Sequence, residues 1–262
     1  MDLAQELVDY IVDFLHDDPT TLLRVSLVSK AWVNRTRIHI FESLKIDESK
    51  FASSNTSYLT PLCGYVKTLH FTWPKGAIDP SSILDCFEQS KPHTLAIHSC
   101  ELYTLSEWTI RLPFAKFPRA SITALELHDI YPTHGTLLTL LSLFPNVDDL
   151  TISVSEWGDE PDNEEITQRI SPPRFRGSFK SFDLPHRGPR GLHRGKCLST
   201  IAALPLQFQT VSLSIGERSW EEMSWEEIWT FLNSCSKTVK KVFLVLPYCK
   251  SRPCIPSTVP CV

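Results

Sequence analysis

The sequence predicts an α/β chain with two unlike parts. Residues 1–46 show the spacing of apolar residues that is typical of short amphipathic helices. From residue 60 to residue 250, short strand patterns alternate with helix patterns, as expected for parallel strands connected by helices. The strand pattern recurs at a roughly constant interval, which favours an irregular solenoid of parallel strands and helices.

Composition places the chain among ordinary folded proteins. Of its 262 residues, 42% are hydrophobic and 21% are charged, and the formal net charge is −4. The N-terminus opens with an acidic residue, and Asp9 and Asp13 interrupt its apolar run, so it does not fit a signal peptide. No apolar run in the sequence has the length of a membrane span. The eight cysteines are scattered and form no C-x-x-C pair. We therefore expect a cytoplasmic or nuclear protein with reduced cysteines and no membrane partner.

The first 46 residues predict three short helices. The first helix carries an apolar stripe at helical spacing, formed by Leu7, Ile11, Phe14 and Leu15. Asp18 can cap the second helix, with Pro19 in its first turn, and Ser29 can cap a third helix over KAWVNRTRIHIF. Three helices in so few residues bury little surface between them. The unit therefore needs a neighbour.

This N-terminal segment resembles an F-box, and its style is similar to the F-box proteins of mushroom-forming fungi. The positions that match the family pattern in order are Leu3, Glu6, Leu7, Ile11, Leu15, Leu22, Val28, Ser29 and Trp32. One position departs from the pattern, because Ala4 stands where the family has a proline. In the family, that proline shapes the entry to the helix that touches the adaptor.

The resemblance implies that the chain binds a Skp-type adaptor and, through it, a cullin. The residues it implies for adaptor binding or for the core of the module are Leu3, Leu7, Ile11, Leu15, Leu22, Val28 and Trp32. We expect a non-catalytic substrate-recognition subunit of a Skp–cullin–F-box ubiquitin ligase, whose repeats bind an unidentified protein substrate. Two alternatives stay open: an F-box scaffold without a ligase role, and an unrecognised enzyme or nucleic-acid-binding repeat protein.

Seven strand patterns follow, over residues 66–71, 93–98, 122–129, 147–153, 179–184, 210–216 and 240–246. Their apolar anchors are Leu69, Leu95, Leu125, Leu150, Phe182, Leu213 and Val242. The spacing between successive anchors is typical of leucine-rich repeats. The segment LLTLLSLFPNVDDLTIS resembles the helix-to-strand step of F-box leucine-rich-repeat proteins. Helix patterns cover residues 81–90, 135–146 and 224–235. An α/β domain without repeats would give similar spacings.

Regularity is lost over residues 155–196, where an acidic block precedes a basic block rich in proline and glycine. We expect a long charged loop on one face of the repeats. Alternatively, these charged residues form the rim of a binding face of the repeats. Residues 251–262 form a proline-rich tail that does not continue the repeat pattern.

Motifs for catalysis or cofactor binding are absent from the sequence: no nucleophile elbow, phosphate-binding loop or HExxH helix occurs. The best metal-like cluster is His93, His98 and Cys100, where strand alternation would point His98 and Cys100 the same way. It lacks a fourth ligand, so we expect no metal, no cofactor and no catalytic residue. Phenylalanines in the basic block could stack on bases, but the net acidic chain makes nucleic acid the less favoured partner.

Three tryptophans occur close together in ERSWEEMSWEEIWTFLNSC. Helical spacing predicts that Trp225 and Trp229 pack in the core, on one face with Ile228 and Leu232. Trp220 is left open as either a core residue or an exposed binding anchor.

Overall fold

A computed structural model describes residues 4–47, 59–73, 80–154, 177–181, 198, 202, 207–214 and 225–245. Its α-helices are α1 (Gln5–Phe14), α2 (Pro19–Val25), α3 (Lys30–Ile40), α5 (Thr60–Cys63), α6 (Ser81–Asp85), α7 (Glu107–Arg111), α8 (His134–Ser142) and α10 (Trp225–Cys235). Its strands are β1 (Ser43–Ile46), β2 (Thr68–Thr72), β3 (Thr94–His98), β4 (Ala124–Ile130), β5 (Asp149–Val154), β6 (Ser178–Ser181), β7 (Thr210–Ser214) and β8 (Lys241–Val245). Short 3-10 turns cover Leu102–Thr104, Leu112–Phe114 and Arg119–Ser121.

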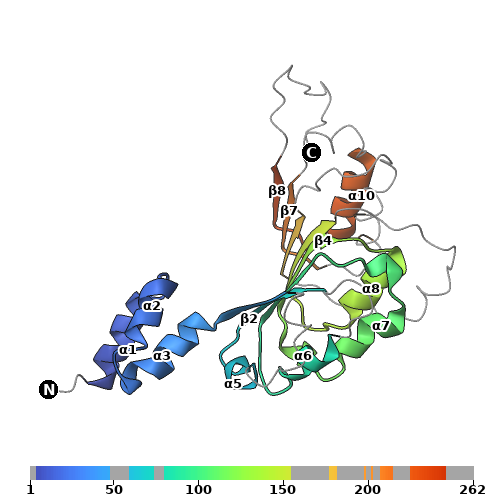
Figure 1. Ribbon diagram of the computed structural model, residues 1–262. Coiled ribbons are helices and arrows are strands. Elements are labelled where there is room, and N and C mark those ends of the chain that lie inside the picture. Colours follow the sequence, from blue (N-terminus) through green and yellow to red (C-terminus); the bar gives the residue numbers. More distant parts are fainter. Residues whose placement is uncertain are drawn as a thin grey trace, which may run out of the picture.

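The eight strands form one parallel sheet in the order of the sequence, from β1 to β8. Helices α5 to α8 and α10 lie on the same side of this sheet (Figure 1). Each strand therefore pairs with its immediate neighbours in the chain, and the described helices between strands share one side, as in a leucine-rich-repeat-like solenoid. The predicted α/β class and the parallel arrangement are confirmed.

Apolar residues on alternate positions of the strands fix the register. Leu69 pairs with Leu95, Leu95 with Leu125, and Leu125 with Leu150, as the predicted anchors require. The next partner of Leu150 is Phe179, not the predicted Phe182, which lies outside the described residues. Phe179 then pairs with Val211, not with the predicted anchor Leu213. These side chains face the helices and are fully buried, so they form the spine of the core.

Strand β1 was not predicted from the sequence. It follows α3 after two residues and pairs with β2 through Leu44 and Leu69. The connection is reinforced by Glu42, whose carbonyl accepts hydrogen bonds from the backbone N–H groups of Lys67 and Thr68. The end of the helical segment is thereby joined directly to the first edge of the sheet.

The three N-terminal helices form a unit that projects from the β1 edge of the sheet (Figure 1). The predicted helix caps are confirmed: Asp18 accepts a hydrogen bond from the N–H of Thr21, and Ser29 accepts one from Ala31. The core of this unit consists of Val8, Val12 and Leu22 and is separate from the core of the sheet. We call α1 to α3 with their connections the helical module.

The expected charged loop and tail fall largely outside the described residues. Within residues 155–196, the structure describes residues 177–181, which contain β6, and residues 251–262 are not described. None of the described helices combines the length and the apolar character that crossing a bilayer requires.

Candidate functional site

The helical module exposes several large apolar side chains to solvent. On α1 these follow the predicted stripe, with Leu7 and Ile11 exposed and Phe14 80% accessible. Past the end of α2, Leu27 is 86% accessible. The complete set, which we call the apolar face, consists of Leu7, Tyr10, Ile11, Phe14, Leu23, Leu27 and Val28. A group of exposed large apolar side chains on so small a module is typical of a surface that another protein covers.

The opposite side of α1 holds the module together. Val8 and Val12 are buried and meet Leu22 of α2. Trp32, at the start of α3, is partly buried and packs against the same cluster, together with Leu15, Val25 and Ile40. Helix α1 is therefore apolar on two sides, one facing its own module and one facing solvent.

This arrangement separates the residues that the sequence placed in a single set. Leu22 belongs to the module core, and Leu15 and Trp32 pack on that core. Leu7, Ile11 and Val28 face solvent. Leu3 lies outside the described residues.

Sequence reasoning missed several members of both sides. Tyr10, Leu23 and Leu27 belong to the apolar face and were not identified. Val8 and Val12, four residues apart, form a second apolar row on α1 that was also overlooked. The sequence contained the information needed, because Val8 and Val12 form an apolar row beside the predicted stripe. A helix that is apolar on more than one side requires more than one contact surface.

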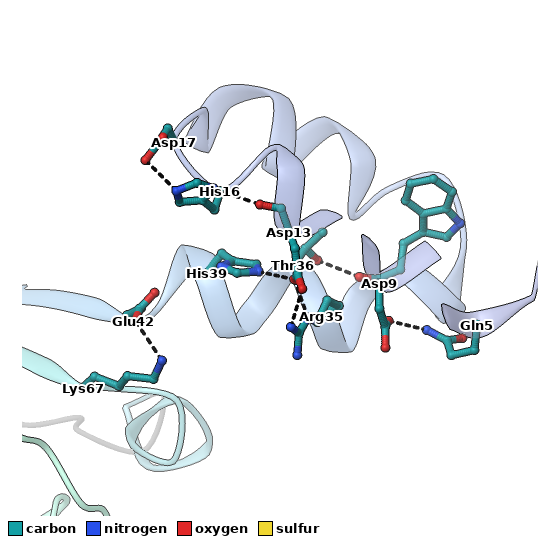
Figure 2. Close-up of polar contacts among 11 residues, drawn as sticks. Gln5, Asp9, Asp13, His16, Asp17, Arg35, Thr36, His39, Glu42 and Lys67 are labelled. Atoms are coloured by element: carbon teal, nitrogen blue, oxygen red, sulfur yellow. Dashed lines mark hydrogen bonds and ion pairs between the residues drawn. The ribbon is translucent and has the colours of Figure 1, made fainter. Parts of the chain in front are cut away.

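A partly accessible ion cluster joins α3 to α1. Asp13 accepts two hydrogen bonds of 2.6 Å from the guanidinium of Arg35, and its carboxylate lies 2.8 Å from Nε2 of His39 (Figure 2). Hydrogen bonds from Arg35, followed by the contact with His39, lower the pKa of Asp13 to about 2. The cluster orients α1 and thereby sets the direction in which the apolar face points.

We expect Asp13→Asn to lower the free energy of unfolding by about 1 kcal/mol, because the two-pronged ion pair is lost but remains partly accessible to solvent. The pKa of Asp13 is lower in the folded chain than its ordinary 3.8. Its stabilising contribution is therefore present above pH 3.8 and is lost as the pH falls through about 2. Thermal unfolding of wild type and variant between pH ~6 and pH ~2 measures this difference.

The matched control for this prediction is Asp17→Asn, which removes an ion pair between Asp17 and His16 at the exposed end of the same module. We expect little change in stability from that variant. The prediction would be contradicted if the difference in unfolding free energy between wild type and Asp13→Asn did not become smaller towards pH ~2.

The metal-like cluster of the sequence does not assemble as expected. His98 is the last residue of β3, and the following Ser99 has a positive φ of 53°. The chain turns there, so Cys100 is fully buried in the core while His98 lies at the surface of the sheet. Burial raises the pKa of the Cys100 thiol well above its usual value. Strand alternation does not extend past His98, so the prediction that His98 and Cys100 share one side was wrong.

The prediction for Trp229 was also wrong, because its side chain is 63% accessible. The buried face of α10 consists instead of Ile228, Phe231 and Cys235. Phe231 packs against Phe179 of β6, with 5.2 Å between ring centroids. The side chain of Trp225 is not among those described, and Trp220 lies outside the described residues.

No protein-family model matches the chain, and no curated protein matches it. Among solved structures, the chain is similar to the leucine-rich repeat-containing protein LegL7 from Legionella pneumophila, at 16% sequence identity and a TM-score of 0.46. The similarity covers 81% of this chain and 69% of that chain.

Proposed function

We propose that the chain is a substrate-recognition subunit of a Skp–cullin–F-box ubiquitin ligase. In this proposal the helical module binds a Skp-type adaptor, and the repeat sheet binds a substrate protein. The observation that carries the proposal is the apolar face, which stays exposed although the chain has a large core of its own. The resemblance of residues 1–46 to an F-box supplies the kind of partner that such a face would bind.

Docking of the module follows from ordinary burial energetics. A groove on the adaptor would receive α1 and the turn after α2, in the manner of a helix bound in an apolar groove. Each large apolar side chain that becomes buried contributes roughly 1.5–3 kcal/mol before the costs of association. Phe14 and Leu27 would contribute most to the free energy of binding, because they are the most exposed members of the apolar face.

The proposed contribution to ubiquitin transfer is positional. The short β1 connection joins the module to the sheet, and the ion pair of Glu42 with Lys67, 2.8 Å long, spans the same junction (Figure 2). A substrate held on the sheet would therefore stand in a defined position relative to the adaptor. Holding a substrate lysine near a charged conjugating enzyme raises its effective concentration without any catalytic group in this chain.

Reconstitution tests the proposal directly. The purified chain is mixed with a Skp-type adaptor, a cullin and its RING subunit, and complex formation is followed by size-exclusion chromatography. A stable complex that ubiquitinates a protein captured by the repeat sheet supports the proposal. Adaptor binding without ubiquitination of any captured protein favours the scaffold alternative, and the absence of adaptor binding rejects the role in a ligase.

Ala4, the position that departs from the F-box pattern, already has the backbone of a proline. Its φ is −60°, within the range that the proline ring imposes, and its carbonyl accepts hydrogen bonds from the N–H groups of Leu7 and Val8. We expect Ala4→Pro to stabilise the module by about 0.4–1 kcal/mol, because it restricts the unfolded chain. Adaptor affinity, measured by calorimetry, is expected to stay the same or increase.

The control for this substitution is Ala31→Pro at the start of α3. There the N–H of Ala31 donates to the hydroxyl of Ser29, and proline removes that hydrogen bond. We expect this variant to be less stable than wild type. Destabilisation of both variants to the same extent would show that Ala4 does not tolerate a proline.

A further inference from the structure

Three histidines lie in a row across the sheet, on β2, β3 and β4. The rings of His98 and His128 stack with their centroids 4.8 Å apart, and these residues are direct partners in the strand register. The ring of His70 stacks on the other side of His98 at 5.7 Å, with 3.4 Å between Nδ1 of His70 and Nε2 of His98. We call these three residues the histidine row.

The histidine row belongs to the face of the sheet opposite the helices. The strand residues beside His70, namely Leu69 and Phe71, are fully buried on the helix side, whereas His70, His98 and His128 are partly accessible. The described helices of the repeat region all lie on the other side of the sheet (Figure 1). A ligand that approaches this face therefore meets the imidazoles and none of the described helices.

Charged neighbours of the row come from the flanking strands. Lys45 of β1 is the register partner of His70, and its charge acts on His98. Two acids on β4 oppose it: Glu126 contacts His128 at 3.2 Å, and Asp129 acts on His98 through its charge. Lys45 and the three histidines thus cross β1 to β4, and Glu126 and Asp129 lie beside them on β4.

The backbone is specialised where this band ends. Among the described residues, the non-glycine positions with positive φ are Ser99 and Asp129, at 53° and 52°. Each directly follows a histidine of the row. Left-handed backbone is unfavourable for residues with a Cβ and concentrates at functional sites. Two successive repeats therefore keep the same unfavourable turn next to the stacked pair His98 and His128.

We propose that the histidine row, together with Lys45, binds an acidic segment of a partner protein, with carboxylates of that segment accepting hydrogen bonds from the imidazoles and the ammonium group. This inference rests on the proposed function, because the partner is the substrate that the repeat sheet would capture. Charge complementarity selects the occupant: Lys45 is a cation, and of the three histidines Glu126 contacts only His128, so protonation of the neighbouring His98 and His70 would be favoured by a further anion.

Protonation links this binding to pH. The pKa of His98 lies below its usual value, chiefly because of burial and then because of the nearby His128, His70 and Lys45, with Asp129 acting in the opposite direction. A bound carboxylate favours the charged imidazole, so the complex takes up protons that the free chain does not hold. Affinity for an acidic segment should therefore increase as the pH falls from about 7.5 to about 6.

The test uses the full chain and a fluorescein-labelled peptide of alternating glutamate and glycine, with binding followed by anisotropy. We expect wild type to bind it about tenfold more tightly at pH ~6 than at pH ~7.5. His98→Gln keeps a polar side chain but cannot become charged, and is expected to weaken binding at the lower pH by about tenfold and to flatten the pH dependence. A peptide with glutamine in place of glutamate should not bind.

His93→Gln provides the matched control, because His93 is exposed, precedes β3 in the same repeat and is not part of the row. It should bind as wild type does. Equal affinities of His98→Gln and His93→Gln, or tighter row-dependent binding of a single-stranded oligonucleotide than of the peptide, would overturn the proposal. Thermal unfolding confirms that both variants are folded. The assay contains no adaptor, so its failure is distinguishable from a failure of adaptor binding by the helical module.

Discussion

Replacing Leu7 and Ile11 together by aspartate is expected to abolish binding to a Skp-type adaptor while leaving the chain folded. Both side chains are exposed members of the apolar face, so the free protein loses little packing. In a complex they would be buried, and each loss removes about 2 kcal/mol of burial energy and adds the cost of desolvating a carboxylate. A combined loss of at least about 4 kcal/mol corresponds to roughly a thousandfold weaker affinity.

Co-purification with the adaptor, followed by calorimetry, measures this effect. The matched control is Trp108→Asp with Leu112→Asp, which makes the same chemical change at the same four-residue spacing on an exposed part of the repeat region. That control should bind the adaptor as wild type does, and circular dichroism should show both double variants folded. Equal recovery of the adaptor by the two double variants would rule out the apolar face as its binding surface.

The helical module could be predicted from the sequence except for the direction in which α1 faces. The caps at Asp18 and Ser29 were identified correctly because capping depends on side chains only two or three residues away. Periodicity alone did not decide which apolar row of α1 is buried. Val8 and Val12 are core because α2 and α3 cover them, and that choice depends on tertiary contacts that the spacing of residues does not encode.

In the sheet, prediction succeeded where anchors are single and unambiguous, as at Leu95 and Leu125. It failed where two apolar residues compete, because Phe179 and not Phe182 continues the register. Strand β1 was missed because it is short and follows a helix immediately. Pairing with the neighbouring strands decides which of two apolar residues lies in register. The pattern of a single strand does not decide it.

The histidine row shows what periodicity does not reveal. His70, His98 and His128 lie far apart in the chain and became neighbours only through the parallel register of β2 to β4. From the sequence, His98 was grouped only with His93 and Cys100, which lie close to it in the chain. In a solenoid the relevant neighbours of a surface residue are one repeat away, so candidate sites are found by aligning repeats.

A truncation in the core of the repeat region should have the opposite effect to the aspartate substitutions. Phe114 is fully buried, and its ring meets those of Phe117 and Phe144 edge-on, at 5.8 and 5.4 Å. We expect Phe114→Ala to lower the free energy of unfolding by about 3–5 kcal/mol, since it removes a large side chain and leaves a cavity among aromatic rings. Urea unfolding measures the change, and Trp108→Ala, an exposed aromatic nearby, should cost far less.

Adaptor binding by this variant tests whether the two cores are independent. The module core of Val8, Val12 and Leu22 is separate from the cluster that contains Phe114. Under conditions where Phe114→Ala remains folded, its affinity for the adaptor should therefore match that of wild type. If instead it lost the adaptor as completely as the Leu7→Asp/Ile11→Asp variant, the module would depend on the sheet for its fold. The helical module could then not be regarded as an independent docking unit.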